Sequence, residues 1–426
     1  MKQQVLCENE NPLSAQSPAT VDSANEEFYA KFPYPRPPLT FPQLEDPDFE
    51  TVMLNQSIGD FTHRTISSSA SIWVAGCGTN QAVYTALRFP GSTVLGSDLS
   101  PASLEIAAKN AGSLGIKNLT LRQESLNDVN YKEEFDYILN TGVIHHNAEP
   151  LKPLAKIARA LRPQGVLELM VYNRYHRLFN TAFQKVVRML AGSGDRSATY
   201  DEQLAICQAL AATEPVASSS YMAPFRDAHA SHLADALIQP VEYNYTVESL
   251  QALVSQCGLE LFLPCNDQFD LMANRVWTIK FSTAELQQRV DRLPDVVKWQ
   301  ITNLLLLQQS PMLWFFVRYR GTGDDGRYEA RLNQEFLGTK FVPASTQLRN
   351  YVRGSDMNYT RSATTLPYPI PPRNQLVSQI RERADGRREL RQILNDLGID
   401  ITSYKTITDL RVQSTTSLCP YLKAVR

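Results

Sequence analysis

The regular alternation of short apolar runs with helical stretches between residues 72 and 173 constrains the fold most. Runs of strand length occupy residues 72–77, 93–100, 118–126, 135–142 and 166–173. Stretches with helical spacing lie between them, the longest at 100–115 and 150–165. Strands that alternate with helices in this way form a parallel sheet with helices on both faces. We therefore expect an α/β fold over this part of the chain.

The rest of the chain divides into segments of different composition. Residues 1–25 are polar, which predicts disorder. Residues 26–66 are expected to form an N-terminal cap, which begins with a segment where aromatic residues alternate with prolines. The strand signal disappears over residues 173–244, where helical patterns indicate a lid insertion over the ligand crevice. Residues 312–320 (MLWFFVRYR) read as a late strand that closes a domain over 67–320. After a glycine- and aspartate-rich linker, residues 328–426 are expected to form a separate, small α+β domain.

Composition excludes several classes of protein. The formal net charge of −2 argues against non-specific nucleic-acid binding. No apolar run reaches the length of a signal-peptide core or a membrane span, which predicts a cytoplasmic protein without membrane insertion. The six cysteines form no CxxC pair. A disulfide framework or a zinc site is therefore not expected, and the cysteines predict a reducing compartment.

The stretch VAGCGTNQ, residues 74–81, follows the first predicted strand. Gly76 and Gly78 match the first two glycines of a nucleotide-binding turn, but the third position is Gln81, which does not favour the passage of a pyrophosphate. Asp98 closes the next strand, where a carboxylate can accept hydrogen bonds from both hydroxyls of a ribose. A ligand with a ribose and without a diphosphate is indicated, and S-adenosylmethionine (SAM) fits that description.

Residues 70–172 resemble the class I SAM-dependent methyltransferases. The resemblance rests on VAGCGTN, GSDLSPASLEIAAKN, LGIKNLTLRQESL, FDYILNTGVIHHNAEP and IARALRPQGVLELMVYN. It implies a Rossmann-like, seven-stranded methyltransferase sheet that extends to residue 320, with SAM as cofactor. The segments KFPYPRPP and NRYHR also resemble a bacterial subgroup of these enzymes that often joins other modules.

The resemblance implies a set of cofactor contacts. Asp98 takes the ribose and Leu99 packs on the adenine. Asn80 stands where the family commonly has glycine, and is expected to cap the following helix or to contact the cofactor carboxylate. Ser125 stands where the family places an acid for the adenine amino group; whether Ser125 or Glu124 faces the base stays open, because neighbouring strand residues point to opposite sides. The remaining predicted contacts come from the glycine loop, a backbone amide and the fourth strand end: Gly76, Cys77, Gly78, Leu126, Asn140, Thr141 and Gly142.

Two adjacent histidines follow the fourth strand. His145 or His146 can remove a proton from an attacking N–H or O–H, because imidazole titrates near neutrality. The alternative is that one caps a helix and the other packs behind the loop. An amine that is already deprotonated needs no base at all.

Candidate substrate contacts come from the cap and from the end of the fifth strand: Tyr34, Arg36, Tyr172, Asn173 and Arg174. For Tyr34 and Arg36, a purely structural role in packing the cap on the sheet is an equal alternative. For Arg174, the alternative is an ion pair with a surface acid. His229 and His232 have H-x-x-H spacing without a visible third ligand, so no metal site is expected.

Three functions remain open at this point. The first is methylation of nitrogen or oxygen on a small-molecule acceptor, natural products included. The second is methylation of a protein or peptide that the C-terminal domain grips, and the third is a catalytically silent binding module. Residues 384–425 faintly resemble winged-helix modules, which bind peptides or mediate dimers, so a homodimer is a further expectation.

Overall fold

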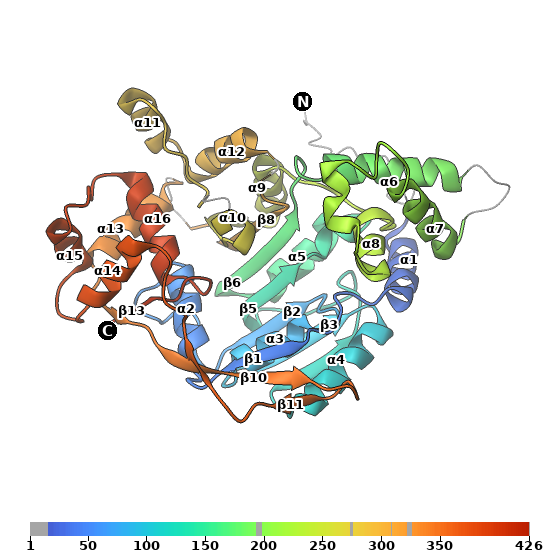
Figure 1. Ribbon diagram of the computed structural model, residues 1–426, viewed down its shortest axis with the longest axis horizontal. Coiled ribbons are helices and arrows are strands. Elements are labelled where there is room, and N and C mark those ends of the chain that lie inside the picture. Colours follow the sequence, from blue (N-terminus) through green and yellow to red (C-terminus); the bar gives the residue numbers. More distant parts are fainter. Residues whose placement is uncertain (1–15, 193–197, 273–275, 308, 322–325, 426) are drawn as a thin grey trace.

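A computed structural model describes residues 16–425 except 193–197, 273–275, 308 and 322–325 (Figure 1). Its centre is a seven-stranded sheet in the order β4-β3-β2-β5-β6-β8-β7. The strands are β2 (Ser71–Ala75), β3 (Thr93–Asp98), β4 (Leu119–Gln123), β5 (Phe135–Thr141), β6 (Leu161–Tyr172), β7 (Leu259–Pro264) and β8 (Met312–Tyr319). The pairs among β4, β3, β2, β5 and β6 are parallel, whereas β8 runs antiparallel to β6 and β7. The expected seven-stranded, Rossmann-like α/β sheet is confirmed.

Apolar residues of the sheet serve two cores, one on each face. Along β2, Ile72 and Val74 belong to one core, and Trp73 and Ala75 to the other. This follows from the alternation of side chains along a strand. One face is covered by α2 (Phe49–Ser57), α3 (Gln81–Arg88) and α4 (Pro101–Leu114), and the other by α5 (Leu151–Ala160), α9 (Val247–Ser255) and α12 (Asp295–Leu306). Two covered faces explain why the strands read as continuous apolar runs.

The insertion predicted at 173–244 is helical. It contains α6 (Leu178–Ala191), α7 (Tyr200–Ala211), the 3₁₀ helix η3 (Ser220–Phe225) and α8 (Ala230–Leu237). These helices share an apolar cluster with α1 (Pro18–Lys31), to which Phe28 contributes its fully buried ring. Figure 1 shows α6, α7, α8 and α1 together at one end of the sheet. We call this group of helices the lid.

The expected disorder of residues 1–25 is wrong where the structure describes them. Residues 1–15 lie outside the described part, but Pro18–Lys31 form α1. The Ser17 side chain accepts a hydrogen bond from the backbone N–H of Thr20, and Pro18 stands at the first helical position. The helix is polar by composition, yet it buries Val21, Asn25 and Phe28 against other parts of the chain. Tertiary packing therefore orders a segment whose composition alone indicates disorder.

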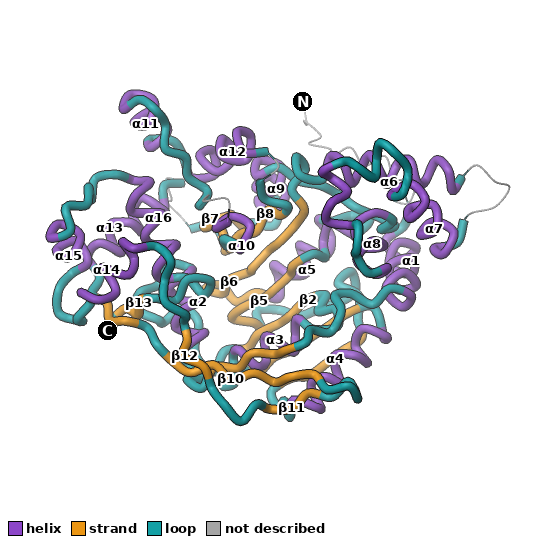
Figure 2. Tube along the Cα trace, viewed as in Figure 1, coloured by secondary structure: helices purple, strands orange, loops and turns teal. Residues whose placement is uncertain are grey.

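The C-terminal region has helices and strands, but it does not stand apart from the rest. Its elements are α13 (Tyr328–Gly338), β9 (Phe341–Pro343), β10 (Thr346–Arg353), β11 (Tyr359–Arg361), β12 (Leu366–Tyr368), α14 (Gln375–Arg383), α15 (Leu390–Asp396), α16 (Tyr404–Thr415) and β13 (Leu422–Ala424). The cap strand β1 (Thr40–Leu44) pairs antiparallel with β10. Figure 1 labels the two strands side by side, and Figure 2 shows β10, β11 and β12 along the lower edge of the molecule. Phe336 and Leu394 also share a core with Leu54 and Val74. The expectation of a separate domain is corrected, because strand pairing and a common core join this region to the cap; the winged-helix likeness stays a prediction.

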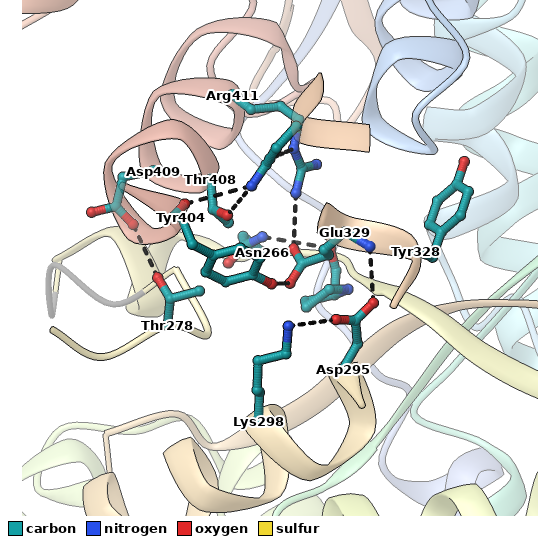
Figure 3. Close-up of polar contacts among 12 residues, drawn as sticks. Asn266, Thr278, Asp295, Lys298, Tyr328, Glu329, Tyr404, Thr408, Asp409 and Arg411 are labelled. Carbon is teal, nitrogen blue, oxygen red and sulfur yellow. Dashed lines mark hydrogen bonds and ion pairs between the residues drawn. The ribbon is translucent and has the colours of Figure 1, made fainter. Parts of the chain in front are cut away.

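A buried ionic network fastens the C-terminal helices to α12 (Figure 3). The Glu329 carboxylate accepts hydrogen bonds from the Arg411 guanidinium and the Tyr404 hydroxyl, both at 2.8 Å. Asp295 accepts from the backbone N–H of Glu329 at 2.8 Å and forms an ion pair with Lys298 at 2.9 Å. Because these charged side chains are buried, removal of one partner leaves another charge without compensation.

The remaining short helices are α10 (Gln268–Met272) and α11 (Ala284–Asp291). None of the helices in the described ranges combines the length and apolar character needed to cross a membrane.

We predict that Glu329→Gln lowers the free energy of unfolding by about 3 kcal/mol, because Arg411 then keeps its buried charge without a counter-ion. Glu285→Gln in α11 is the matched control. It breaks an exposed ion pair with Arg289 and is expected to change stability by less than about 0.5 kcal/mol. Urea unfolding followed by circular dichroism measures both. A loss at Glu329 as small as that at Glu285 would contradict the proposed fastening role.

Candidate active site

The glycine loop between β2 and α3 has two close approaches that only glycine allows. Gly76 and Gly78 have φ values of +79° and +51°. A Cβ on Gly76 would lie 2.5 Å from a methyl of Val143, and a Cβ on Gly78 would lie 2.7 Å from the backbone oxygen of Tyr34. The loop is therefore held between the end of β5 and the aromatic-proline segment of the cap.

Asp98 ties the end of β3 to this loop. One carboxylate oxygen accepts from the backbone N–H of Gly78 at 2.8 Å, and the other from that of Ser100 at 2.9 Å. Burial raises the pKa of the Asp98 carboxyl, and these backbone hydrogen bonds act in the opposite direction. Each oxygen accepts up to two hydrogen bonds. Asp98 can thus hold the loop and accept from two ligand hydroxyls at once.

A cavity of about 460 Å³ lies over the ends of these strands. Most of the predicted site residues line it: Tyr34, Gly76, Cys77, Gly78, Asn80, Asp98, Leu99, Glu124, Leu126, Thr141, Gly142, His146 and Tyr172. The structure does not bring the remaining predicted residues to the cavity wall: Arg36, Ser125, Asn140, His145, Asn173 and Arg174.

Glu124, not Ser125, faces the cavity. The Glu124 carboxylate lines it and accepts from the Tyr131 hydroxyl at 2.9 Å. Ser125 instead donates its hydroxyl to Asp22 of α1. In this structure the acid lies beside the cavity and the serine holds α1; contact between Glu124 and the adenine amino group stays a prediction.

Asn80 holds the cap. Its side-chain amide donates to the backbone oxygen of Arg36 at 2.9 Å, and the neighbouring Thr79 hydroxyl donates to that of Pro35. Asn80 stands at the N-cap position of α3, but its side chain makes no capping hydrogen bond. The capping expectation is therefore wrong, because the side chain turns toward the cap segment instead.

The predicted residues away from the cavity have structural or surface positions. Asn140 donates to the backbone oxygen of Ala75 at 2.9 Å, which joins β5 to β2. Asn173 donates to the backbone oxygen of Ser310 at 2.8 Å. Arg36 and Arg174 are exposed. Direct contact between these four side chains and a ligand in this cavity is not supported by the structure.

The two histidines differ in position. His145 is fully buried against His146 and Tyr172, with ring centroids 4.1 and 4.3 Å away, and neither of its ring nitrogens has a hydrogen-bond partner among the described residues. Burial holds its pKa well below the ordinary value. His145 is thus the histidine that packs behind the loop.

His146 lines the cavity. Its Nδ1 lies 2.7 Å from the backbone oxygen of Val241. Since a carbonyl only accepts, we assign the proton to Nδ1, which leaves the lone pair on Nε2. Burial lowers the pKa of His146 to about 4, partly offset by the negative charge of Glu242. At neutral pH the ring is therefore an uncharged, weak base.

Sequence reasoning missed residues of the N-terminal helix and of the insertion that line the cavity. Asn25 and Tyr29 come from α1, and Asp235 from α8. The Asn25 amide donates to the backbone oxygen of His146 at 2.8 Å. No local motif marks these side chains, because their place depends on how α1 and the lid fold back over the sheet.

His229 and His232 lie in the lid. His229 accepts from the backbone N–H of Ser231 at the start of α8, and His232 stacks near Tyr34. Over the described ranges, no three His, Cys, Asp or Glu side chains gather closely enough to hold a metal ion.

Comparison with known proteins identifies the family of the central region. Residues 67–205 match the family model of a methyltransferase domain. This part of the chain is a class I SAM-dependent methyltransferase domain. Its cofactor is SAM, and the cavity lining fits that molecule: Asp98 offers acceptors for a ribose diol, and Leu99 and Leu126 offer apolar surface.

The similar proteins that have curated names are distant. Uncharacterized protein syc1184_c of Synechococcus is 27% identical over 63% of this methyltransferase and 64% of its own length. A ubiquinone biosynthesis O-methyltransferase of Cereibacter sphaeroides is 30% identical over 25% of this chain and 43% of its own. These matches span less than two thirds of either relative.

Among solved structures, PKMT2 from Rickettsia typhi in complex with AdoHcy has a TM-score of 0.54 at 13% identity, and covers 89% of this chain and 75% of that one. That likeness concerns the fold. It includes the regions on both sides of the methyltransferase domain.

We predict that Gly78→Ala destabilises the methyltransferase by about 2–3 kcal/mol, because the new Cβ meets the backbone of Tyr34 at a left-handed φ. Gly112→Ala in α4 is the control, since a Cβ there meets nothing within 4 Å. It is expected to be neutral or to stabilise by about 0.5–1 kcal/mol. Thermal unfolding compares the two. Equal effects would show that the cap does not press on the loop.

A second prediction concerns Asp235, which lies buried in the lid. Burial raises the pKa of its carboxyl to about 6, partly offset by Arg177. The folded protein thus holds this proton more tightly than the unfolded chain, so the ionised group costs stability above about pH 6. Asp235→Asn is expected to raise the free energy of unfolding by about 1–3 kcal/mol at pH 7.5. The gain should shrink as the pH falls toward 4.

Urea unfolding at a series of pH values measures this effect. Asp227→Asn, at an exposed position of the same insertion, is the matched control and should show no pH-dependent gain. A destabilised Asp235→Asn protein at pH 7.5 would contradict the prediction.

Proposed function

We propose that this chain transfers a methyl group from SAM to a nitrogen or oxygen of a small-molecule acceptor bound beneath the lid. One observation carries the proposal. A single cavity is lined both by the glycine loop and Asp98 and by the lid residues Tyr29 and Asp235. Donor and acceptor can therefore share one cavity, as an in-line displacement requires.

Methyl transfer mainly requires that the protein align donor and acceptor and exclude water from them. The leaving sulfur becomes a neutral thioether, so it needs no proton from the protein. Asp98 and the glycine loop would orient the donor, while the lid would exclude water around the acceptor. His146 is placed to accept a hydrogen bond from an acceptor hydroxyl through Nε2, but its low pKa makes it a weak base.

A peptide or protein acceptor is the second candidate, and one observation favours it. A second cavity of about 520 Å³ shares Tyr84 and Met312 with the first. The C-terminal region contributes Tyr368 and residues 416–418 to its wall. An acceptor longer than the first cavity could extend into this space, with the C-terminal region along one side.

Calorimetric titration with S-adenosylhomocysteine and with SAM tests the proposed function. We expect both to bind the unmodified chain, and Asp98→Asn to weaken binding by at least tenfold, because the amide cannot accept both ribose hydroxyls and hold the loop. Glu105→Gln, an exposed change on α4, is the control and should bind normally. Absence of heat with either compound would overturn the proposal in favour of a silent binding module.

A further inference from the structure

Asp235 is a buried carboxylate in the cavity wall that forms no ion pair with any described side chain. Its oxygens accept from two phenol hydroxyls, those of Tyr29 at 3.2 Å and Tyr172 at 3.5 Å. Within the described part of the chain, no cationic side chain forms an ion pair with it. The side chain is only 5% exposed. A buried carboxylate costs free energy unless a cation or a proton compensates it.

The nearest cation is already engaged elsewhere. Arg177 donates through Nε to Glu242 at 2.8 Å and through a terminal nitrogen to the other Glu242 oxygen. Its guanidinium also lies 4.2 Å from the centre of the Tyr172 ring. The charges of Arg177 and Glu242 compensate each other, so the negative charge of Asp235 remains available to a ligand.

Three tyrosines surround the same end of the cavity. Tyr29, Tyr34 and Tyr172 all line it together with Asp235. Burial raises the pKa of Tyr34 to about 12 and those of the other two well above the ordinary value, so all three are neutral phenols. Aromatic rings beside a carboxylate form a favourable environment for an ammonium group.

We propose that Asp235 and these three tyrosines form the acceptor subsite for an aliphatic primary amine, which enters as its ammonium ion and is deprotonated by Asp235. This inference rests on the proposed function and narrows it to nitrogen. A free small-molecule amine and the side chain of a lysine present the same chemistry to this subsite.

The proposed transfer begins with the loss of a proton from the acceptor. The ammonium gives one proton to the Asp235 carboxylate, which becomes a neutral carboxyl. The free amine lone pair then forms a bond to the methyl carbon, the carbon–sulfur bond breaks, and its electron pair stays on sulfur as a thioether. The product leaves as a methylated ammonium ion, and the Asp235 carboxyl then releases its proton to solvent, which restores the carboxylate.

Asp235 is a better proton acceptor than His146, the other base at the cavity. Burial moves the pKa of the carboxyl up to about 6 and that of the imidazole down to about 4. The groups that face Asp235 are Tyr29, Tyr34 and Tyr172, with Arg177, Glu242 and His146 around them. Of these, only the Arg177–Glu242 pair is charged at neutral pH, so binding of the amine should follow the ionisation of Asp235 itself.

Binding of simple probes to the full chain saturated with S-adenosylhomocysteine tests the inference. We expect n-pentylamine to bind at least tenfold more tightly than n-pentanol, which has the same length without the charge. Asp235→Asn should abolish that preference while its affinity for S-adenosylhomocysteine stays within twofold. Asp227→Asn, a control with the same change of charge, should retain the preference. The preference should also decline as the pH falls below about 6.

A second arm distinguishes the two sources of the amine. A short peptide with one central lysine is compared with the same peptide carrying norleucine. Preference for the lysine peptide over n-pentylamine assigns the subsite to a polypeptide, and the reverse assigns it to a free amine; either supports the amine subsite.

Three results would overturn the inference. The first is equal binding of n-pentylamine and n-pentanol with no preference for the lysine peptide, and the second is an unchanged preference in Asp235→Asn. The third is a loss of S-adenosylhomocysteine affinity in Asp235→Asn, which would assign Asp235 to the donor. If the unmodified chain fails to bind S-adenosylhomocysteine at all, the proposed function fails first, and the two failures are thereby distinguished.

Discussion

The hydrogen bond from the backbone N–H of Gly78 to the Asp98 carboxylate is the interaction on which the site depends. It links the loop after β2 to the end of β3, the two neighbouring strands that would hold opposite parts of the cofactor. The glycines that make the bond possible also allow Val143 and Tyr34 to approach the loop. The loop conformation, the strand register and the position of the cap are therefore set together.

The two departures from the family pattern have a common explanation in the structure. Asn80 replaces a glycine and holds the cap through the backbone of Arg36. Ser125 replaces an acid and donates to Asp22 of α1. Both side chains fasten the N-terminal region over the cavity. In the sequence these departures leave a silent module open as an alternative, whereas in the structure both side chains hold the N-terminal region at the cavity.

The local sequence pattern predicts the sheet and the glycine loop, because the residues that determine each of them lie close together in the chain. The run 72–75 and the turn at Gly76 and Gly78 carry their own signal, and Asp98 follows from its place after a strand. Asp235 carries no such signal, since a single carboxylate on a helix is ordinarily solvated. Its burial is decided by contacts with Tyr29, more than 200 residues earlier. The pairing of β1 with β10 is equally remote in sequence, which is why the C-terminal region reads as separate. Adjacent residues such as His145 and His146 pose a different limit, because spacing cannot decide which of the two reaches the cavity.

A crystal structure of the chain with S-adenosylhomocysteine tests the central claim most directly. The account predicts that both ribose hydroxyls lie within hydrogen-bonding distance of the Asp98 carboxylate, with the sulfur directed toward the end of the cavity that Tyr172 and Asp235 close. A ligand bound elsewhere, or a ribose turned away from Asp98 while the glycine loop keeps its conformation, would contradict it.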